Sequence, residues 1–310
     1  MLANRKIVII GAGHVGSHCA YALAIQGICD EIVLVDKDQT KAKSHSIADS
    51  VSFFNSSVIV RCGDYSDCND ADIIVISAGV PRLPGQTRLD VLDGSVECVR
   101  DIVSNLNKIE IKGIIITITN PADIIADFVR KATGLPKNRV FSTGTSLDTA
   151  RMRRTVADLC NIAPQSVIGF AMGEHGDSSM VPFSNLTIFG KNYKHLKEEN
   201  PERFGKLSEK VITDQTHMRG MDIIEGKGST EFGIGTALAD MAKAVLMDEH
   251  RILPASTLLE GEYGQTNVHA GVPCIIGRNG IEQIIELNLT DEELKQFENS
   301  CNVIKQHMVE

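Results

Sequence analysis

The sequence predicts an α/β fold in which a doubly wound parallel sheet is followed by an α+β domain. Short β-branched apolar runs recur along the first half of the chain, with helical patterns between them. Parallel strands joined by crossover helices produce this alternation. The first run, at 7–10, leads into a glycine-rich turn, and the second, at 31–35, ends in Asp36.

The glycine-rich turn has the pattern G-x-G-x-x-G, with Gly11, Gly13 and Gly16 at the three fixed positions. The first glycine allows a tight turn, the second lets a pyrophosphate approach the backbone, and the third allows close helix packing. Asp36 follows Gly16 by 20 residues, where a carboxylate accepts hydrogen bonds from ribose hydroxyls and repels a 2′-phosphate. The pattern therefore predicts a Rossmann domain that binds NAD rather than NADP. The alternative is a glycine turn that holds no ligand.

Composition excludes several classes of protein. The net charge of -9 argues against a nucleic-acid partner, and no apolar run approaches the length of a membrane span. Residues 1–6 are too short and polar for a signal peptide, so we expect a cytoplasmic protein. The 8 cysteines contain no C-x-x-C pair and are expected to be reduced structural thiols. His14 and His18 share a helix face without a third ligand, so no metal is expected and both are interpreted as surface residues.

The rest of the chain extends this pattern into two domains, expected at 1–147 and 148–310, which share a cleft. The 310 residues are enough for one large or two medium domains. Further strands are expected at 57–60, 72–77, 114–119, 139–142, 167–170, 251–260 and 272–276, with a hairpin at 184–192. Helices are expected at 40–49, 91–109, 202–225, 232–247 and 291–310, with another starting at 148.

Candidate ligand-binding residues follow the predicted strands. Ala78 and Gly79 are small enough for a cofactor phosphate to approach. Lys41 and Tyr65 could flank the adenine half of a dinucleotide, or could be surface residues. Asn120 could face a ligand at the same sheet edge, or could cap the next helix.

The segment 80–90 contains two prolines and two arginines, Arg82 and Arg88, at the carboxyl end of a predicted strand. Prolines and glycine prevent a regular element, and α/β sheets bind ligands at this edge. The segment is interpreted as a mobile lid, with a solvated basic loop as the alternative.

A histidine between glycines, His175 in the run 173–178, is typical of an exposed catalytic imidazole rather than a core residue. Earlier in the chain, Asp148 and Arg151 are three residues apart and lie on one helix face. A structural ion pair between them is the alternative interpretation.

Together these motifs resemble the NAD-dependent lactate/malate dehydrogenase family. The glycine turn with its aspartate, P-G-x-T-R, T-N-P, L-D-x-x-R and G-E-H-G-D occur in this order over nearly the whole chain. The resemblance implies reversible hydride transfer between NADH and a 2-keto acid. In this family pattern His175 would be the acid and base, and Asp148 would fix its tautomer. Arg151 would bind the substrate carboxylate. Arg88 would polarise the ketone, and Asn120 would orient the reacting oxygen.

The resemblance also assigns the remaining contacts. Thr230 would touch the substrate, and Ile234 is similar to the residue that backs the nicotinamide ring. The predicted cofactor contacts are Gly11, Gly13, Val15, Gly16, Asp36, Lys41, Tyr65, Ala78, Gly79 and Asn120.

The substrate is where the family patterns conflict. Arg82 and Gln86 resemble the residues of malate enzymes at these lid positions, where the second carboxylate of oxaloacetate needs a cation. Gly220 leaves more room beside the substrate than the alanine of many lactate enzymes. The runs 144–147, 173–178 and 230–234 resemble lactate and 2-hydroxyisocaproate dehydrogenases instead. Because Arg82 would contact the substrate, the sequence favours malate and oxaloacetate. L-lactate or 2-hydroxyisocaproate remain alternatives, and a non-catalytic NAD-binding module is a remote one.

Regulation and assembly also follow from the resemblance. Many bacterial lactate dehydrogenases bind fructose 1,6-bisphosphate through an arginine and a histidine. Arg153 matches the first, but Ile168 occupies the second position, so activation by this effector is not expected. We expect a homotetramer, with a dimer as the alternative.

Overall fold

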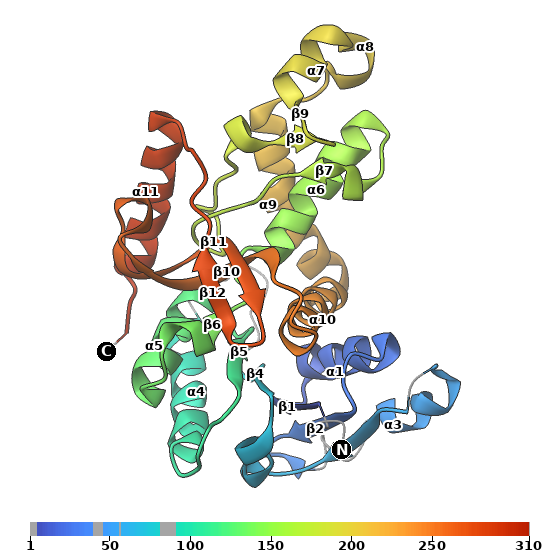
Figure 1. Cartoon of the computed structure of the whole chain (residues 1–310), viewed down its shortest axis with the longest axis vertical. Helices are drawn as coiled ribbons and strands as arrows, with labels where there is room; N and C mark the ends of the chain where they lie inside the picture. The colour runs from blue at the N-terminus through green and yellow to red at the C-terminus, as the bar shows by residue number, and fades with distance from the viewer. Residues whose placement is uncertain (1–4, 40–45, 56, 81–90, 310) are drawn as a thin grey trace.

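The structure is a computed structural model that describes residues 5–39, 46–55, 57–80 and 91–309. A nine-stranded sheet runs through it in the order β12-β11-β10-β6-β5-β4-β1-β2-β3 (Figure 1). Strands β1 to β6 are parallel, and their order 3-2-1-4-5-6 is that of a doubly wound dinucleotide-binding sheet. They are β1 (Lys6–Ile10), β2 (Glu31–Val35), β3 (Ile59–Cys62), β4 (Ile73–Ile76), β5 (Ile114–Thr117) and β6 (Val140–Ser142).

Except at the edge strand β3, both faces of this sheet are buried, which explains why most of its strands are continuous apolar runs. On β1, Ile7 and Ile9 join the core on one face, and Val8 and Ile10 join the core on the other. The helices of this half are α1 (His14–Gln26), α3 (Ile47–Ser50), α4 (Leu92–Leu106) and α5 (Ala122–Thr133).

The second half of the chain starts with α6 (Ser146–Cys160) and contributes two groups of strands. A small antiparallel sheet contains β7 (Val167–Ile168), β8 (Thr187–Ile188) and β9 (Lys191–Asn192). The antiparallel strands β10 (Arg251–Glu260), β11 (Thr266–Gly277) and β12 (Gly280–Ile284) extend the large sheet. They join it through the pairing of Ser256 with Ser142 of β6, so the two halves share one sheet.

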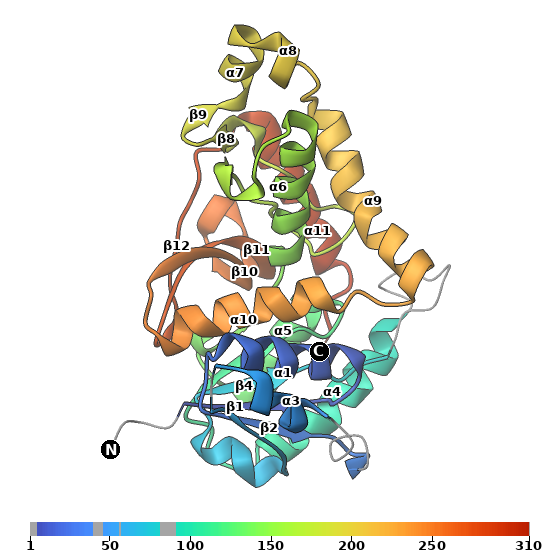
Figure 2. The same cartoon turned by 90° about the vertical axis from the view of Figure 1, so that its right-hand side faces the viewer.

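The remaining helices are α7 (Tyr193–Glu199), α8 (Pro201–Phe204), α9 (Glu209–Lys227), α10 (Phe232–Leu246) and α11 (Asp291–Lys305). Helix α10 lies along α1, and α9 runs from the small sheet down to the start of α10 (Figure 2). Among the described residues, no helix combines the length and the apolar character that crossing a bilayer requires.

Several element boundaries differ from the predictions. The helix expected at 202–225 is two helices. Helix α8 ends at Gly205, whose N–H donates to the carbonyl oxygen of Pro201, and α9 begins only after Ser208. The strand expected at 272–276 begins at Thr266 and is followed by β12, which was not predicted. Most of the helix expected at 40–49 and all of the lid at 81–90 lie outside the described residues. The domain boundary at 147/148 stays a prediction.

Candidate active site

A cavity of about 420 Å³ opens where the parallel strands end and the second half of the chain packs against them. Its walls come from the glycine turn, the ends of β4 and β5, the start of α6, the loop around His175, and the face of α9 with the segment that follows it. Parallel sheets place ligands at this edge.

The glycine turn has the close packing that a phosphate-binding turn requires. Gly11 has φ +105°, and a Cβ there would lie 2.6 Å from the backbone nitrogen of Ala78. A Cβ at Gly16 would lie 1.9 Å from the carbonyl oxygen of Gly11. A Cβ at Gly13 would meet nothing within 4 Å, and this residue lines the cavity. The turn therefore leaves free space beside the first residues of α1, where a pyrophosphate can reach backbone N–H groups.

Asp36 is fixed at the end of β2 by two backbone donors. Its carboxylate accepts hydrogen bonds from the N–H of Ala12 at 2.8 Å and the N–H of Asp38 at 2.9 Å. The carboxylate is thus tied to the glycine turn. The buried hydroxyl of Ser77 also lines the cavity and has no partner among the described residues, so it is available to a ligand. These features fit NAD.

The predicted cofactor residues divide into three groups by their position relative to the cavity. Gly13, Val15, Gly79 and Asn120 line the cavity, whereas Gly11, Gly16, Asp36, Tyr65 and Ala78 do not. Tyr65 packs against the core beside α4, and burial raises the pKa of its hydroxyl to about 12. Lys41 lies outside the described residues, as do Arg82, Gln86 and Arg88.

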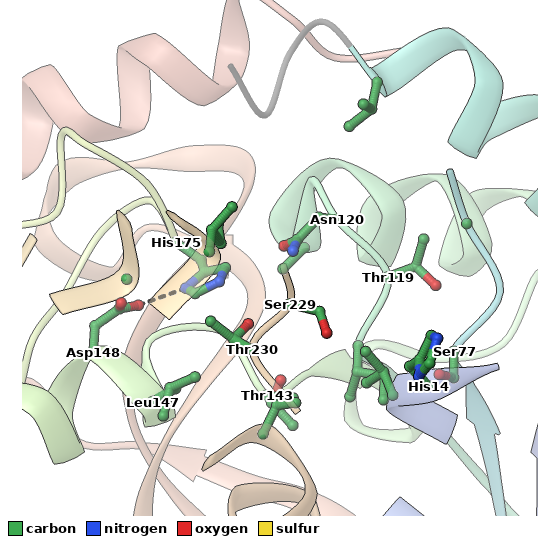
Figure 3. A pocket seen from close by; sticks show the side chains of 18 of the residues that line it. His14, Ser77, Thr119, Asn120, Thr143, Leu147, Asp148, His175, Ser229 and Thr230 are labelled. Atoms are coloured by element: carbon green, nitrogen blue, oxygen red, sulfur yellow. Dashed lines mark hydrogen bonds and ion pairs between the residues drawn. The ribbon is translucent and has the colours of Figure 1, made fainter. Parts of the chain in front are cut away.

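The cavity contains a chain of three hydrogen-bonding groups. Nδ1 of His175 lies 2.5 Å from Oδ2 of Asp148 (Figure 3). Oδ1 of the same carboxylate accepts a hydrogen bond from Arg151 at 2.9 Å. Asp148 and Arg151 both lie on α6 and form the ion pair of the alternative interpretation, and both residues also line the cavity. The structure thus places imidazole, carboxylate and guanidinium in contact.

His175 is less exposed than the sequence predicts. The sequence suggests an exposed imidazole, but only 13% of this side chain is accessible, because α5, β11 and α11 surround its loop. The ring still faces the cavity, with Asn120 and Thr230 on nearby walls (Figure 3). A half-buried imidazole is well suited to acid–base chemistry, since neighbours hold it in position.

Sequence reasoning missed His217. On α9, His217, Gly220 and Ile224 line the cavity, and Nε2 of His217 lies 2.8 Å from the hydroxyl oxygen of Ser179. Their spacing of three and four residues is helical and could have identified one face of α9.

His14 and His18 are interpreted as surface residues, and 86% of the His14 side chain is exposed, although His14 also lines the cavity. The two imidazoles lie 3.7 and 3.3 Å from the carboxylate of Glu231, which is buried. Burial opposes the charged form of Glu231, but hydrogen bonds from Lys227 and Ser229 outweigh it and hold its pKa below the usual range.

Comparison with known proteins identifies the family. Residues 5–142 match the family model for the lactate/malate dehydrogenase NAD binding domain, and residues 145–310 match that for the lactate/malate dehydrogenase alpha/beta C-terminal domain. The chain belongs to the lactate/malate dehydrogenase family. It is an NAD-dependent dehydrogenase of 2-hydroxy acids, as its motifs predict.

The relatives found are named for lactate. An L-lactate dehydrogenase of Fusobacterium nucleatum is 43% identical over 310 residues, covering 99% of this chain and 97% of that protein. An L-lactate dehydrogenase 3 of Bacillus anthracis is 42% identical over 307 residues, covering 98% and 97%. The crystal structure of a minor L-lactate dehydrogenase from Enterococcus mundtii, in its ligands-bound form, matches with a TM-score of 0.92 at 36% identity, covering 98% of each chain.

Proposed function

We propose that this chain is an L-lactate dehydrogenase that reduces pyruvate with NADH and catalyses the reverse reaction. The observation that carries the chemistry is the contact of His175, Asp148 and Arg151 in a cavity that also reaches the glycine turn. Relatives at 38–43% identity support lactate over malate, although the sequence alone favours malate.

In the proposed mechanism, His175 exchanges the proton of the reacting oxygen at Nε2, because Nδ1 is turned toward Asp148. Asp148 keeps the ring in this orientation and stabilises its charged form. Arg151 binds the substrate carboxylate through its planar guanidinium. When bound, the nicotinamide supplies or accepts the hydride, while Asn120 and Thr230 orient the keto acid.

Arg82 supports oxaloacetate as a second candidate, because a cation in the closed lid would pair with a second carboxylate. A 2-hydroxyisocaproate-type substrate is the third. The test is the ratio of kcat/KM for pyruvate, oxaloacetate and 2-ketoisocaproate with NADH at one pH and salt concentration. A preference for pyruvate supports the proposal. A preference for oxaloacetate that collapses in Arg82→Gln contradicts it and assigns the chain to malate.

The acid–base assignment has its own test. His175→Asn removes the titrating ring and should abolish turnover while NADH still binds, which fluorescence titration measures. Surviving turnover would show that another group transfers the proton.

Further expectations complete the proposal. We place the boundary between the NAD-binding and substrate domains at 147/148, and we expect a homotetramer, which light scattering can test. We also expect no activation by fructose 1,6-bisphosphate. Ile168 is half-exposed and supplies no cation, and Arg153 donates hydrogen bonds to the carbonyl oxygen of Gly169.

A further inference from the structure

The loop that carries His175 is held through three successive backbone N–H groups. The N–H of Gly173 donates to the carbonyl oxygen of Gly271, and that of Glu174 donates to the hydroxyl of Ser300 at 2.8 Å. The N–H of His175 donates to Oδ2 of Asp123, also at 2.8 Å. Of these three acceptors, only the last is a carboxylate.

Asp123 is an unusual residue at its place in the fold. It is the second residue of α5, where an aspartate ordinarily faces solvent and caps its own helix, yet only 3% of it is exposed. Burying a carboxylate is costly unless it forms strong hydrogen bonds. Here the carboxylate turns away from its own helix to a loop 52 residues later in the chain.

We propose that Asp123 is a positioning residue of the dehydrogenase, which fixes the backbone of His175 relative to the substrate. The inference rests on the proposed role of His175 as the proton-transfer group. Asp148 orients the imidazole ring, and Asp123 holds the main chain from which the ring projects. The two carboxylates together leave the imidazole little freedom to rotate or to move away from the cavity.

The position of α5 explains what this contact controls. The helix begins directly after Asn120 and Pro121, so Asp123 is only three residues from the proposed oxygen-orienting amide. The hydrogen bond therefore connects the two groups that would contact the reacting oxygen. Proton transfer needs its partners within hydrogen-bond reach, and a displacement of about 1 Å can cost a hundredfold in rate.

The charge of Asp123 strengthens this contact at neutral pH. Burial raises the pKa of Asp123 to about 6, against the opposing effects of Ser256 and the N–H of His175. The carboxyl group is therefore mostly ionised at pH 7, and hydrogen bonds to an ionised acceptor are about twice as strong as neutral ones.

The experiment compares Asp123→Ala, which removes the acceptor, with Asp123→Asn, which keeps an acceptor oxygen of the same shape. Asp123→Ala should lower kcat for pyruvate reduction about 10- to 100-fold. The KM for pyruvate and the Kd for NADH should change less than about threefold, because Arg151 and the glycine turn are untouched. Asp123→Asn should restore kcat to within about threefold of the unmodified enzyme. If Asp123→Ala does not fold, Asp123→Ser takes its place, since its hydroxyl is too short to reach the N–H of His175.

Asp127 provides a matched control on the same helix. It lies one turn later, is equally buried, and pairs with His269 at 3.2 Å and Lys131 at 2.7 Å rather than with the active-site loop. Asp127→Asn should keep kcat within about threefold.

Three results would overturn the proposal: unchanged kcat in Asp123→Ala, no rescue by Asp123→Asn, or an equal loss of kcat in Asp127→Asn. Turnover in His175→Asn would instead refute the proposed function. An inactive His175→Asn beside a fully active Asp123→Ala would refute only the positioning role.

Discussion

Replacing Gly220 with alanine should stabilise the protein and weaken substrate binding at the same time. A Cβ at this position of α9 would lie 3.3 Å from Nη1 of Arg151 and 3.4 Å from Cζ and Nη2. The guanidinium donates a hydrogen bond to Asp148 at 2.9 Å, so displacing it would strain this contact. Gly220 therefore makes room for Arg151, rather than only for the substrate as the sequence suggests.

The size of the effect follows from this contact. Relieving the close contact requires the Arg151 guanidinium to shift by about 0.3 Å. Since a displacement of 1 Å costs about a hundredfold in rate, this shift predicts a roughly fourfold fall in kcat/KM for pyruvate. The fall should be mainly in KM, because Arg151 is expected to hold the substrate carboxylate. Alanine in place of glycine within a helix should raise the free energy of unfolding by roughly 0.5–1 kcal/mol, which is about 1–4 °C in Tm for a chain of this size.

Gly226→Ala is the matched control for this prediction. Gly226 is on the same helix, and its Cβ would meet nothing within 4 Å. The substitution should therefore raise Tm slightly without changing kcat/KM. Steady-state NADH absorbance and thermal melts measure both effects. If Gly220→Ala behaves like Gly226→Ala, or if it lowers Tm, the argument from the Arg151 contact is refuted.

Three further predictions follow from the site. Asp148→Asn should lower kcat about 10²- to 10⁴-fold with unchanged NADH binding, because the imidazole loses its orienting charge; wild-type kcat would exclude this role. Asp36→Ala removes the acceptor of the Ala12 N–H and the repulsion of a 2′-phosphate, so Kd for NADH should rise about tenfold and the NADH/NADPH preference should shrink; an unchanged ratio in fluorescence titrations would contradict it. Burial raises the pKa of Asp123 from 3.8 to about 6, so ionising this group in the folded protein is unfavourable. The free energy of unfolding therefore falls as pH rises through this window. Asp123→Asn should therefore gain up to roughly 3 kcal/mol over wild type between pH 4 and pH 7.5 in urea unfolding, and a pH-independent difference would contradict this sign.

The parallel half of the fold could be predicted because its strands are buried on both faces. Residues 7–10 and 73–76 are apolar at every position, so each strand is visible without knowledge of its neighbours. The edge strand β12 has buried and exposed residues in an irregular order, and its sequence GIEQI has no clear period. The interruption of the predicted helix at 202–225 contains no proline after Pro201, and only Gly205 and Ser208, whose residue types commonly end and begin helices, indicate it.

The candidate site follows the same division. The glycine turn follows β1 directly, Asn120 lies three residues after β5, and His175 stands between glycines, so local motifs locate them. His217 depends on how α9 packs against the cavity, and Asp123 depends on a contact across 52 residues. Such relations come from tertiary packing, which a motif does not describe.

Asp148 and Asp123 are both buried next to His175, but their surroundings give them different roles. Asp148 accepts a hydrogen bond from the guanidinium of Arg151 and contacts the imidazole, so one cation lies beside its charge. Asp123 accepts a hydrogen bond from the backbone N–H of His175, its other carboxyl oxygen is buried without a hydrogen-bond partner among the described residues, and burial raises its pKa. Asp148 contacts the imidazole ring directly, so it is the carboxylate placed to stabilise an imidazolium during turnover, whereas Asp123 contacts the backbone of His175. The neighbouring arginine in L-D-x-x-R reveals this role in the sequence, whereas the run from Asn120 to Asp123 contains no cation and gives no such signal.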